Sequence, residues 1–118
     1  MQLEVFLNKV RSGERVAFDD TIAVISANYE YSPTRFINGV GEGRVVNEAG
    51  INEGSCKILY FAKLQGLSRA ETLSLFGDHY FKDVLQHPEG ANHTNIRMFM
   101  KSGWEGVAYE GEALKRRR

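Results

Sequence analysis

The sequence predicts a single α+β domain over residues 1–118, with about five helices packed on a small antiparallel sheet. Apolar residues recur at helical spacing in several segments, and a glycine-rich stretch between short apolar runs is typical of a hairpin. No repeat or linker divides the chain, whose length is usual for one domain. A chain of this size buries about two thirds of its unfolded surface, so neither disulfides nor metal are needed for folding.

The N-terminal part of the chain predicts two helices. From Leu3 to about Ser12, and again over residues 14–29, apolar side chains recur every three or four positions and so share one helical face. The second helix is expected to stop before Ser32-Pro33, because the residue before a proline is disfavoured in the helical region.

Residues 34–47 predict the hairpin of the sheet. Short apolar runs flank Gly39, Gly41 and Gly43, a pattern that favours strand, glycine turn and strand. A C-terminal strand near residues 106–110 is expected to add to this hairpin.

Three further helices are expected in the second half of the chain. Residues 53–65 are apolar around most of the helical cylinder, which is typical of a buried central helix. Ser68 and Glu71 form a capping box that starts the next helix, which pauses at Gly77 and then continues. The last helix is predicted over residues 92–102. The continuation after the pause is expected to face inward with Tyr80, Phe81, Val84 and Leu85.

Composition and charge exclude several classes of protein. The chain has 15 basic and 15 acidic side chains and no net charge, so no global field attracts nucleic acid or an anionic membrane. Cys56 is the single cysteine, which excludes an intramolecular disulfide. The sequence has no signal-peptide pattern and no apolar run long enough to span a bilayer, which predicts a soluble cytoplasmic protein. The basic residues 115–118 are expected to form a frayed, solvated tail.

Several short segments of the sequence together identify a protein family, although none of them would do so alone. They are residues 20–29 (DTIAVISANY), 36–39 (FING), 47–57 (NEAGINEGSCK), Phe76-Gly77, Tyr80 with Asp83-Val84-Leu85, His93 with Asn95-Ile96-Arg97, and 100–106 (MKSGWEG). In this combination the chain resembles the HopJ type III effector family. The resemblance implies a bacterial protein delivered into a host cell by a type III secretion system, where a host protein would be its partner. It implies no established activity, catalytic residue or cofactor.

The stretch from Asn47 to Cys56 has the highest density of polar residues, just before the predicted central helix. Asn52 suits the N-cap of that helix, and Glu53 complements its positive end. As a binding surface, this helix entry would comprise Asn47, Glu48, Asn52, Glu53 and Ser55. Glu48 and Glu53 would repel an anion and so favour a cation, an amine or a neutral polar ligand. The alternative is a structural loop with internal hydrogen bonds, which the residue types favour because caps and turns use them too.

Four residues outside this stretch are assigned to the same binding surface. They are Asp20, His93, Arg97 and Trp104. Structural roles are open for them as well: Asp20 can be solvated, and for Arg97 an internal ion pair is favoured. Trp104 is expected more often to pack at a core edge with its indole N–H bonded.

Cys56 is the candidate nucleophile of an alternative function, a small hydrolase-like or transferase-like enzyme. The first turn of a helix lowers the pKa of a thiol, and His79, His87 or His93 could act as the base. A Glu–His pair in a cleft at residues 47–56 is the other catalytic possibility. The apolar residues that follow favour a different role for Cys56, as a small buried hydrophobic side chain.

His79, Asp83 and His87 follow one another at steps of four and would share one helical face, and His93 follows the turn at Pro88–Gly90. These four residues are the candidate metal ligands. Imidazole and carboxylate groups suit zinc and similar ions. The spacing matches no compact metal motif, however, and Lys82 is adjacent, so a solvated polar stripe is favoured and neither metal nor cofactor is predicted. Binding of a small molecule or a protein is therefore the leading functional prediction, ahead of catalysis.

Overall fold

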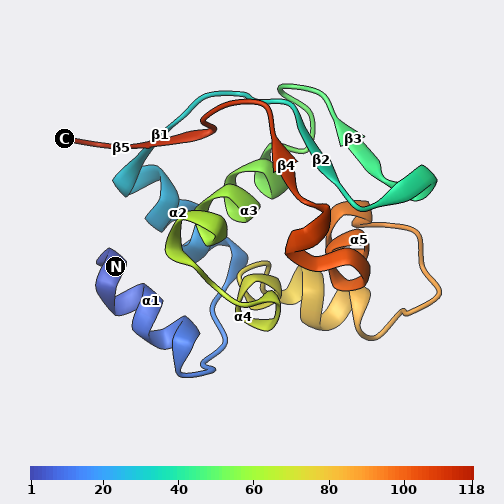
Figure 1. Cartoon of the computed structure of the whole chain (residues 1–118). Coiled ribbons are helices and arrows are strands. Elements are labelled where there is room, and N and C mark those ends of the chain that lie inside the picture. Colours follow the sequence, from blue (N-terminus) through green and yellow to red (C-terminus); the bar gives the residue numbers. More distant parts are fainter.

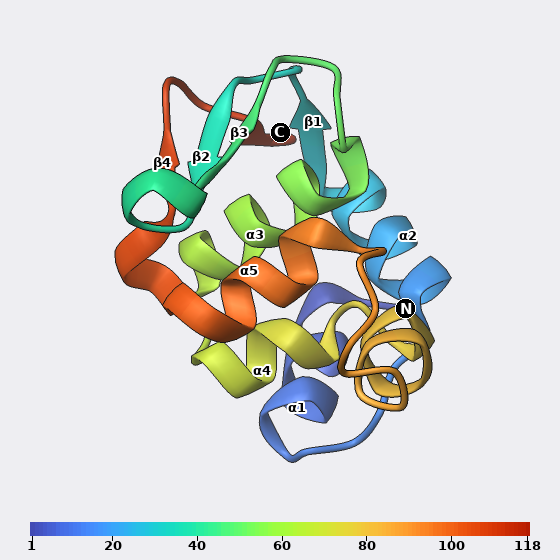
Figure 2. The same ribbon diagram turned by 90° about the vertical axis from the view of Figure 1, so that its right-hand side faces the viewer.

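The helix α3 (Glu53–Gln65) forms the centre of the computed structural model, which describes residues 1–118. Strands lie along one edge of the molecule and the other helices surround α3 below them (Figures 1 and 2). Five residues of α3 are buried, namely Cys56, Ile58, Leu59, Phe61 and Ala62. This agrees with the prediction of a helix that is apolar on most sides. The predicted α+β class, with helices packed on small antiparallel sheets, is confirmed.

The hairpin predicted over residues 34–47 is present. Its strands are β2 (Phe36–Asn38) and β3 (Val45–Asn47), which pair antiparallel around a 3₁₀ turn, η1 (Gly41–Gly43). The predicted C-terminal strand, β4 (Ala108–Tyr109), pairs antiparallel with the other edge of β2. The result is a three-stranded sheet in the order β3-β2-β4.

A second, two-stranded sheet was not predicted. It consists of β1 (Tyr29–Tyr31) and β5 (Leu114–Arg116), which pair antiparallel. The prediction of a solvated tail over residues 115–118 is therefore wrong for its first two residues. Burial of Ala113 and Leu114 in the core explains this, because it brings the end of the chain against β1.

The first two helices are α1 (Leu3–Arg11) and α2 (Phe18–Asn28). The first agrees with the prediction, whereas the second begins four residues later than expected. Ala17, which precedes it, has an extended backbone, and the chain before it passes closely over Gly77. This tertiary contact keeps residues 14–17 out of the helix.

The capping box predicted at Ser68 is confirmed and starts α4 (Arg69–Ser74). The Ser68 hydroxyl accepts from the Glu71 amide at 3.1 Å, and the Glu71 carboxylate accepts from the Ser68 amide at 2.8 Å. After Gly77 the chain forms a π-helix, η2 (His79–Val84), and not the predicted α-helix.

The inward orientation predicted for Leu85 is wrong, since this side chain is 45% exposed whereas Val84 is buried. The wider π-helical turn ends at Val84 and leaves Leu85 outside the packed face. The last helices are α5 (Thr94–Ser102), two residues shorter than predicted, and the 3₁₀ helix η3 (Gly103–Gly106). No helix of the chain is long and apolar enough to cross a membrane.

Substitutions at Gly77 and Gly66 separate the energetic cost of steric overlap from the cost of backbone strain. Both have positive φ, but a Cβ on Gly77 would lie 2.7 Å from the Phe18 amide nitrogen, whereas a Cβ on Gly66 would meet nothing within 4 Å. We expect Gly66→Ala to lower the free energy of unfolding by about 1 kcal/mol through strain alone. Gly77→Ala should cost about 1–3 kcal/mol more because of overlap. Urea denaturation of both variants measures the difference, and equal losses would contradict the close packing at Gly77.

Candidate functional site

A cavity of about 360 Å³ opens where α3 and α5 begin. The start of α3 contributes Asn52, Gly54 and Ser55, and the start of α5 contributes His93, Thr94, Asn95 and Ile96. The remaining lining residues are Phe18, Phe76 and His79. The cavity is thus built from segments far apart in the sequence, and its lining combines polar and aromatic residues.

Asn52 and His93 are the two residues other than glycine with positive φ, at 56° and 52°. Each precedes a helix, and neither caps it with its side chain. Asn and His tolerate this conformation better than most residues, but it still costs about 1–3 kcal/mol. Both residues line the same cavity. Such outliers cluster at ligand sites, which directs attention to this cavity.

Four asparagine side chains hold the two helix starts in place. Asn47 and Asn95 exchange amide hydrogen bonds of 3.1 and 2.9 Å. Asn52 donates to the side-chain oxygen of Asn47 at 2.8 Å, and Asn38 donates to the side-chain oxygen of Asn95 at 3.0 Å. The network therefore connects β2 and β3 to the starts of α3 and α5. Asn38, Asn47 and Asn95 are buried.

This network changes the roles predicted for two residues. Asn47 is consumed by internal hydrogen bonds, as the structural alternative for the helix entry required. Asn52 stands at the N-cap position of α3, but its side chain turns to Asn47 and does not cap the helix. Ser55 and Asn52 line the cavity, as does His93.

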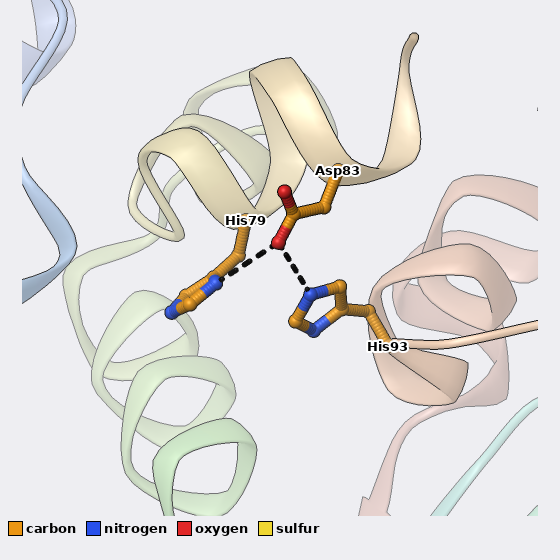
Figure 3. Close-up of side chains that lie close together, drawn as sticks. All are labelled: His79, Asp83 and His93. Carbon is orange, nitrogen blue, oxygen red and sulfur yellow. Dashed lines mark hydrogen bonds and ion pairs between the residues drawn. The ribbon is translucent and has the colours of Figure 1, made fainter. Parts of the chain in front are cut away.

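His79, Asp83 and His93 converge beside the cavity (Figure 3). One carboxylate oxygen of Asp83 lies 2.9 Å from His93 Nε2 and 3.5 Å from His79 Nδ1. The hydrogen bond from His93, assisted by His79, lowers the pKa of the Asp83 carboxyl. The polar stripe predicted for His79, Asp83 and His87 is wrong in its third member. The π-helix ends at Val84, so His87 lies in the following turn and is exposed.

Arg97 fixes the loop between Asp83 and His93. Its guanidinium donates to the carbonyl oxygens of Asn92 at 2.6 Å and His87 at 2.9 Å, and to the Asn92 side chain at 2.8 Å. The internal ion pair favoured for Arg97 is wrong, because backbone carbonyls and an amide take the place of a carboxylate. Arg97 thus positions the loop that carries His93 toward Asp83.

Three acidic residues of the predicted binding surface lie outside the cavity lining. Glu48 is exposed and pairs with Arg35 at 3.3 Å. Glu53 and Asp20 are also exposed and are not among the lining residues. Neither glutamate thus contributes a carboxylate to the wall of this cavity, although Glu53 stands between the lining residues Asn52 and Gly54 in the chain.

Trp104 has the structural role that the sequence predicted as the commoner one. Its indole N–H donates to the Leu67 carbonyl at 2.9 Å, and its ring meets Phe99 edge to face with centroids 5.0 Å apart. It is not part of the cavity wall.

Cys56 is buried, with 1% of its surface exposed, and its Sγ lies 3.6 Å from the Thr34 carbonyl oxygen. Burial raises the pKa of this thiol, opposite to the effect predicted from its place in the first helical turn. Two of the three histidines belong to the cluster with Asp83, and the third is exposed. The surroundings of Cys56 are tyrosines, with Tyr109 donating to its carbonyl oxygen at 2.7 Å. The structure thus gives Cys56 a core role and supplies no base for a nucleophile.

Sequence reasoning missed five residues of the cavity wall, namely Phe18, Phe76, Thr94, Asn95 and Ile96. Asn95 and Ile96 stand in a segment that carries the family resemblance, which was the only available signal for them. The aromatic residues looked like core positions, because apolar spacing does not distinguish a core from a cavity wall.

We expect the pH dependence of stability to reveal the tyrosines around Cys56. Burial raises the pKa of Tyr31, Tyr60, Tyr109 and Cys56. Unfolded tyrosine and cysteine release their protons near about pH 8.5–10, where the folded protein still keeps them. Stability should therefore be complete below this range and fall as the pH rises through it. Urea midpoints from pH 7 to 11 measure this, and Tyr109→Phe should make the decline shallower. An unchanged slope in that variant would contradict the assignment.

Replacement of Asn95 by alanine should destabilise the fold at the cavity. Asn95→Ala removes the side-chain partner that the buried amides of Asn38 and Asn47 share, while Asn38 keeps its 2.9 Å bond to the main-chain carbonyl of residue 95, and the expected loss is about 1–3 kcal/mol in urea denaturation. Asn8→Ala, at an exposed position of α1, is the control and should change stability by about 0.5 kcal/mol or less. A loss at Asn95 as small as the control would show that the network does not stabilise the native state.

The comparisons with known proteins agree with the resemblance seen in the sequence. The family model of the HopJ type III effector protein matches residues 3–114. The crystal structure of VPA0580, a protein of unknown function, is similar with a TM-score of 0.93 and 44% sequence identity. The similarity covers 99% of this chain and 95% of that chain. A comparison with the curated proteins found no significant match.

The matched range includes the cavity, the asparagine network and the cluster of His79, Asp83 and His93. It covers nearly the whole chain, and the predicted resemblance is confirmed. The chain belongs to the HopJ type III effector family.

Proposed function

We propose that the protein binds a small polar molecule in the cavity at the starts of α3 and α5. The observation that carries the proposal is the cavity itself, with a volume of about 360 Å³. Small-molecule sites usually have volumes of about 300–1,000 Å³, so this one suits a small metabolite. A hollow of this kind favours a small molecule over the surface contact that a protein partner would make.

The polar part of the cavity lining offers hydrogen-bond donors. The amides in the first turn of a helix have no intrahelical partner, and they remain free when the N-cap side chain does not accept from them. Neither Asn52 nor His93 makes such a bond, and Gly54, Ser55, Thr94 and Asn95 of the two first turns line the cavity. These donors match a ligand with acceptor oxygens.

The cavity lining also has an apolar and aromatic part. Phe18 and Phe76 contribute to it, and the His79 ring stands edge to face on Phe18 with centroids 4.6 Å apart. A molecule with an apolar or flat body and oxygen acceptors at one end fits both parts. The wall is also rigidly supported, because the buried asparagines fix its polar half.

The name of the family adds a proposal about the route of the protein. It suggests export by a type III secretion system and action in a host cell. That route concerns where the protein works, whereas the cavity concerns what it binds. The enzymatic alternative at Cys56 has no comparable support, since the thiol is buried and its hydrogen-bond partner is the Thr34 carbonyl oxygen.

A ligand screen read by nuclear magnetic resonance tests the binding proposal. Small carboxylates, phosphate esters and polar aromatic metabolites are added to labelled protein, with the amides of Gly54, Ser55 and Thr94 as reporters. A binding compound should shift these amides and raise the melting temperature, since saturation at about 100 times Kd adds about 2.7 kcal/mol to stability.

Two matched variants make the test specific. Ser55→Leu fills part of the cavity and should weaken binding at least about tenfold, because overfilled sites cannot accept a ligand without strain. Ser26→Leu, on the exposed face of α2, should bind as the unchanged protein does. Ligands that bind Ser55→Leu equally well, or that shift amides only elsewhere, would contradict the proposal, as would a screen without any binding compound.

A further inference from the structure

We infer that His79, Asp83 and His93 bind a divalent transition-metal ion of the zinc type. Each residue offers one ligand atom, and the three atoms lie within 4.8 Å of one another. Figure 3 shows the three side chains pointing toward a common point, His79 and Asp83 from the π-helix and His93 from the start of α5. The site goes beyond the proposed function, because an ion can bind whether or not a molecule occupies the cavity.

The distances within the cluster are close to those of a metal site. Ligands bound tetrahedrally to zinc at about 2.0–2.1 Å stand about 3.4 Å from one another. The Asp83 oxygen lies 3.5 Å from His79 Nδ1 and 2.9 Å from His93 Nε2. The two imidazole ligand atoms lie within 4.8 Å of each other, so side-chain rotations that bring them to about 3.4 Å would place all three atoms around one ion.

The chemistry of the donors selects the class of ion. Two imidazoles and one carboxylate suit zinc and related first-row ions, whereas calcium and magnesium prefer oxygen ligands throughout. Three protein ligands leave a coordination position open, as in catalytic zinc sites. The side chains are 28–47% exposed, so an ion can reach them from solvent.

The competing explanation of the cluster is a purely structural clasp, meaning a hydrogen bond that attaches the loop before α5 to the π-helix. The hydrogen bond of 2.9 Å between His93 and Asp83 would suffice for such a clasp. His79 is not needed for it and is too far from Asp83 for a strong hydrogen bond, yet its distance matches the edge of a metal tetrahedron. A metal accounts for the position of the third residue, and the alternative is an ion pair between His79 and Asp83; titration with metal ions distinguishes the two.

The scaffold holds the three residues in place. The His79 ring is held against Phe18, and the loop that leads to His93 is braced by Arg97. His93 itself has a left-handed backbone conformation, at some cost in energy. Irregular backbone of this kind, like the π-helix that carries His79 and Asp83, is common at functional sites.

The nearest cation along the chain is already paired. Lys82 adjoins Asp83 in the sequence, but its ammonium lies 3.5 Å from the carboxylate of Asp78. The positive charge of Lys82 is therefore offset outside the cluster. His79 and His93 belong to both the cluster and the cavity wall, so an ion there would border the cavity.

Titration with Co²⁺ and Zn²⁺ tests the site in tag-free, chelator-treated protein. Binding of one Co²⁺ per chain should produce visible d–d absorption, and Zn²⁺ should displace it. His79→Ala, His93→Ala and Asp83→Asn should each weaken binding about 100-fold or more, since even outer-shell partners change metal affinity by about 10–100-fold. His87→Ala is the matched control, because His87 is exposed and outside the cluster, and it should bind as the unchanged protein does.

Circular dichroism verifies that the variants fold, and the unchanged protein provides a measurement that needs no variant. Zn²⁺ should shift the imidazole resonances of His79 and His93 and leave those of His87 in place. The inference is overturned by a lack of saturable binding, by unaltered affinity in His79→Ala and His93→Ala, or by an equal loss in His87→Ala. Repeating the metabolite screen in chelator keeps the two proposals apart, since cavity binding without metal would survive the failure of the metal site.

Discussion

The reciprocal hydrogen bonds between Asn47 and Asn95 are the interaction on which the site depends. Both side chains are buried, and each amide satisfies the other, so neither can be removed without leaving a polar group unpaired in the core. Through Asn38 and Asn52 the same contact fixes the hairpin and the starts of two helices. The uncapped helix starts therefore meet at one cavity and do not face solvent separately.

Sequence patterns over a few residues correctly predicted the helices and strands that depend on local interactions. The central helix, the capping box at Ser68 and the glycine-rich hairpin all agree with the structure, because apolar spacing, caps and turns operate over a few residues. The pairing of β1 with β5 could not be predicted in this way. Strands of three residues have no readable periodicity, and their partner lies at the opposite end of the chain. The π-helix was read as an α-helix, since both place apolar residues at similar spacing.

The site was predictable only in part, for a related reason. Asn52 and Ser55 stand out in the sequence as a dense polar helix entry, and they do line the cavity. Their role in binding stays a prediction. The meeting of Asp83 with His93 depends on a loop held by Arg97. The sequence named His93 among the candidate ligands, but spacing along one helix grouped Asp83 with His87 and could not place His93. Tertiary hydrogen bonds such as those of Arg97 decide which polar residues become neighbours, and they leave no periodic pattern in the sequence.

The pairing of β1 with β5 also determines the order in which the chain can fold. β5 lies far from β1 in the sequence, so the strand edge of β1 has no partner until both segments have been synthesised. An unpaired edge is a template for association with another chain, and here two tyrosines lie on it. Arg117, which donates to the Ser26 carbonyl at 3.0 Å, helps to close that edge. β5 thus covers a strand edge that would otherwise be open to pairing with another chain.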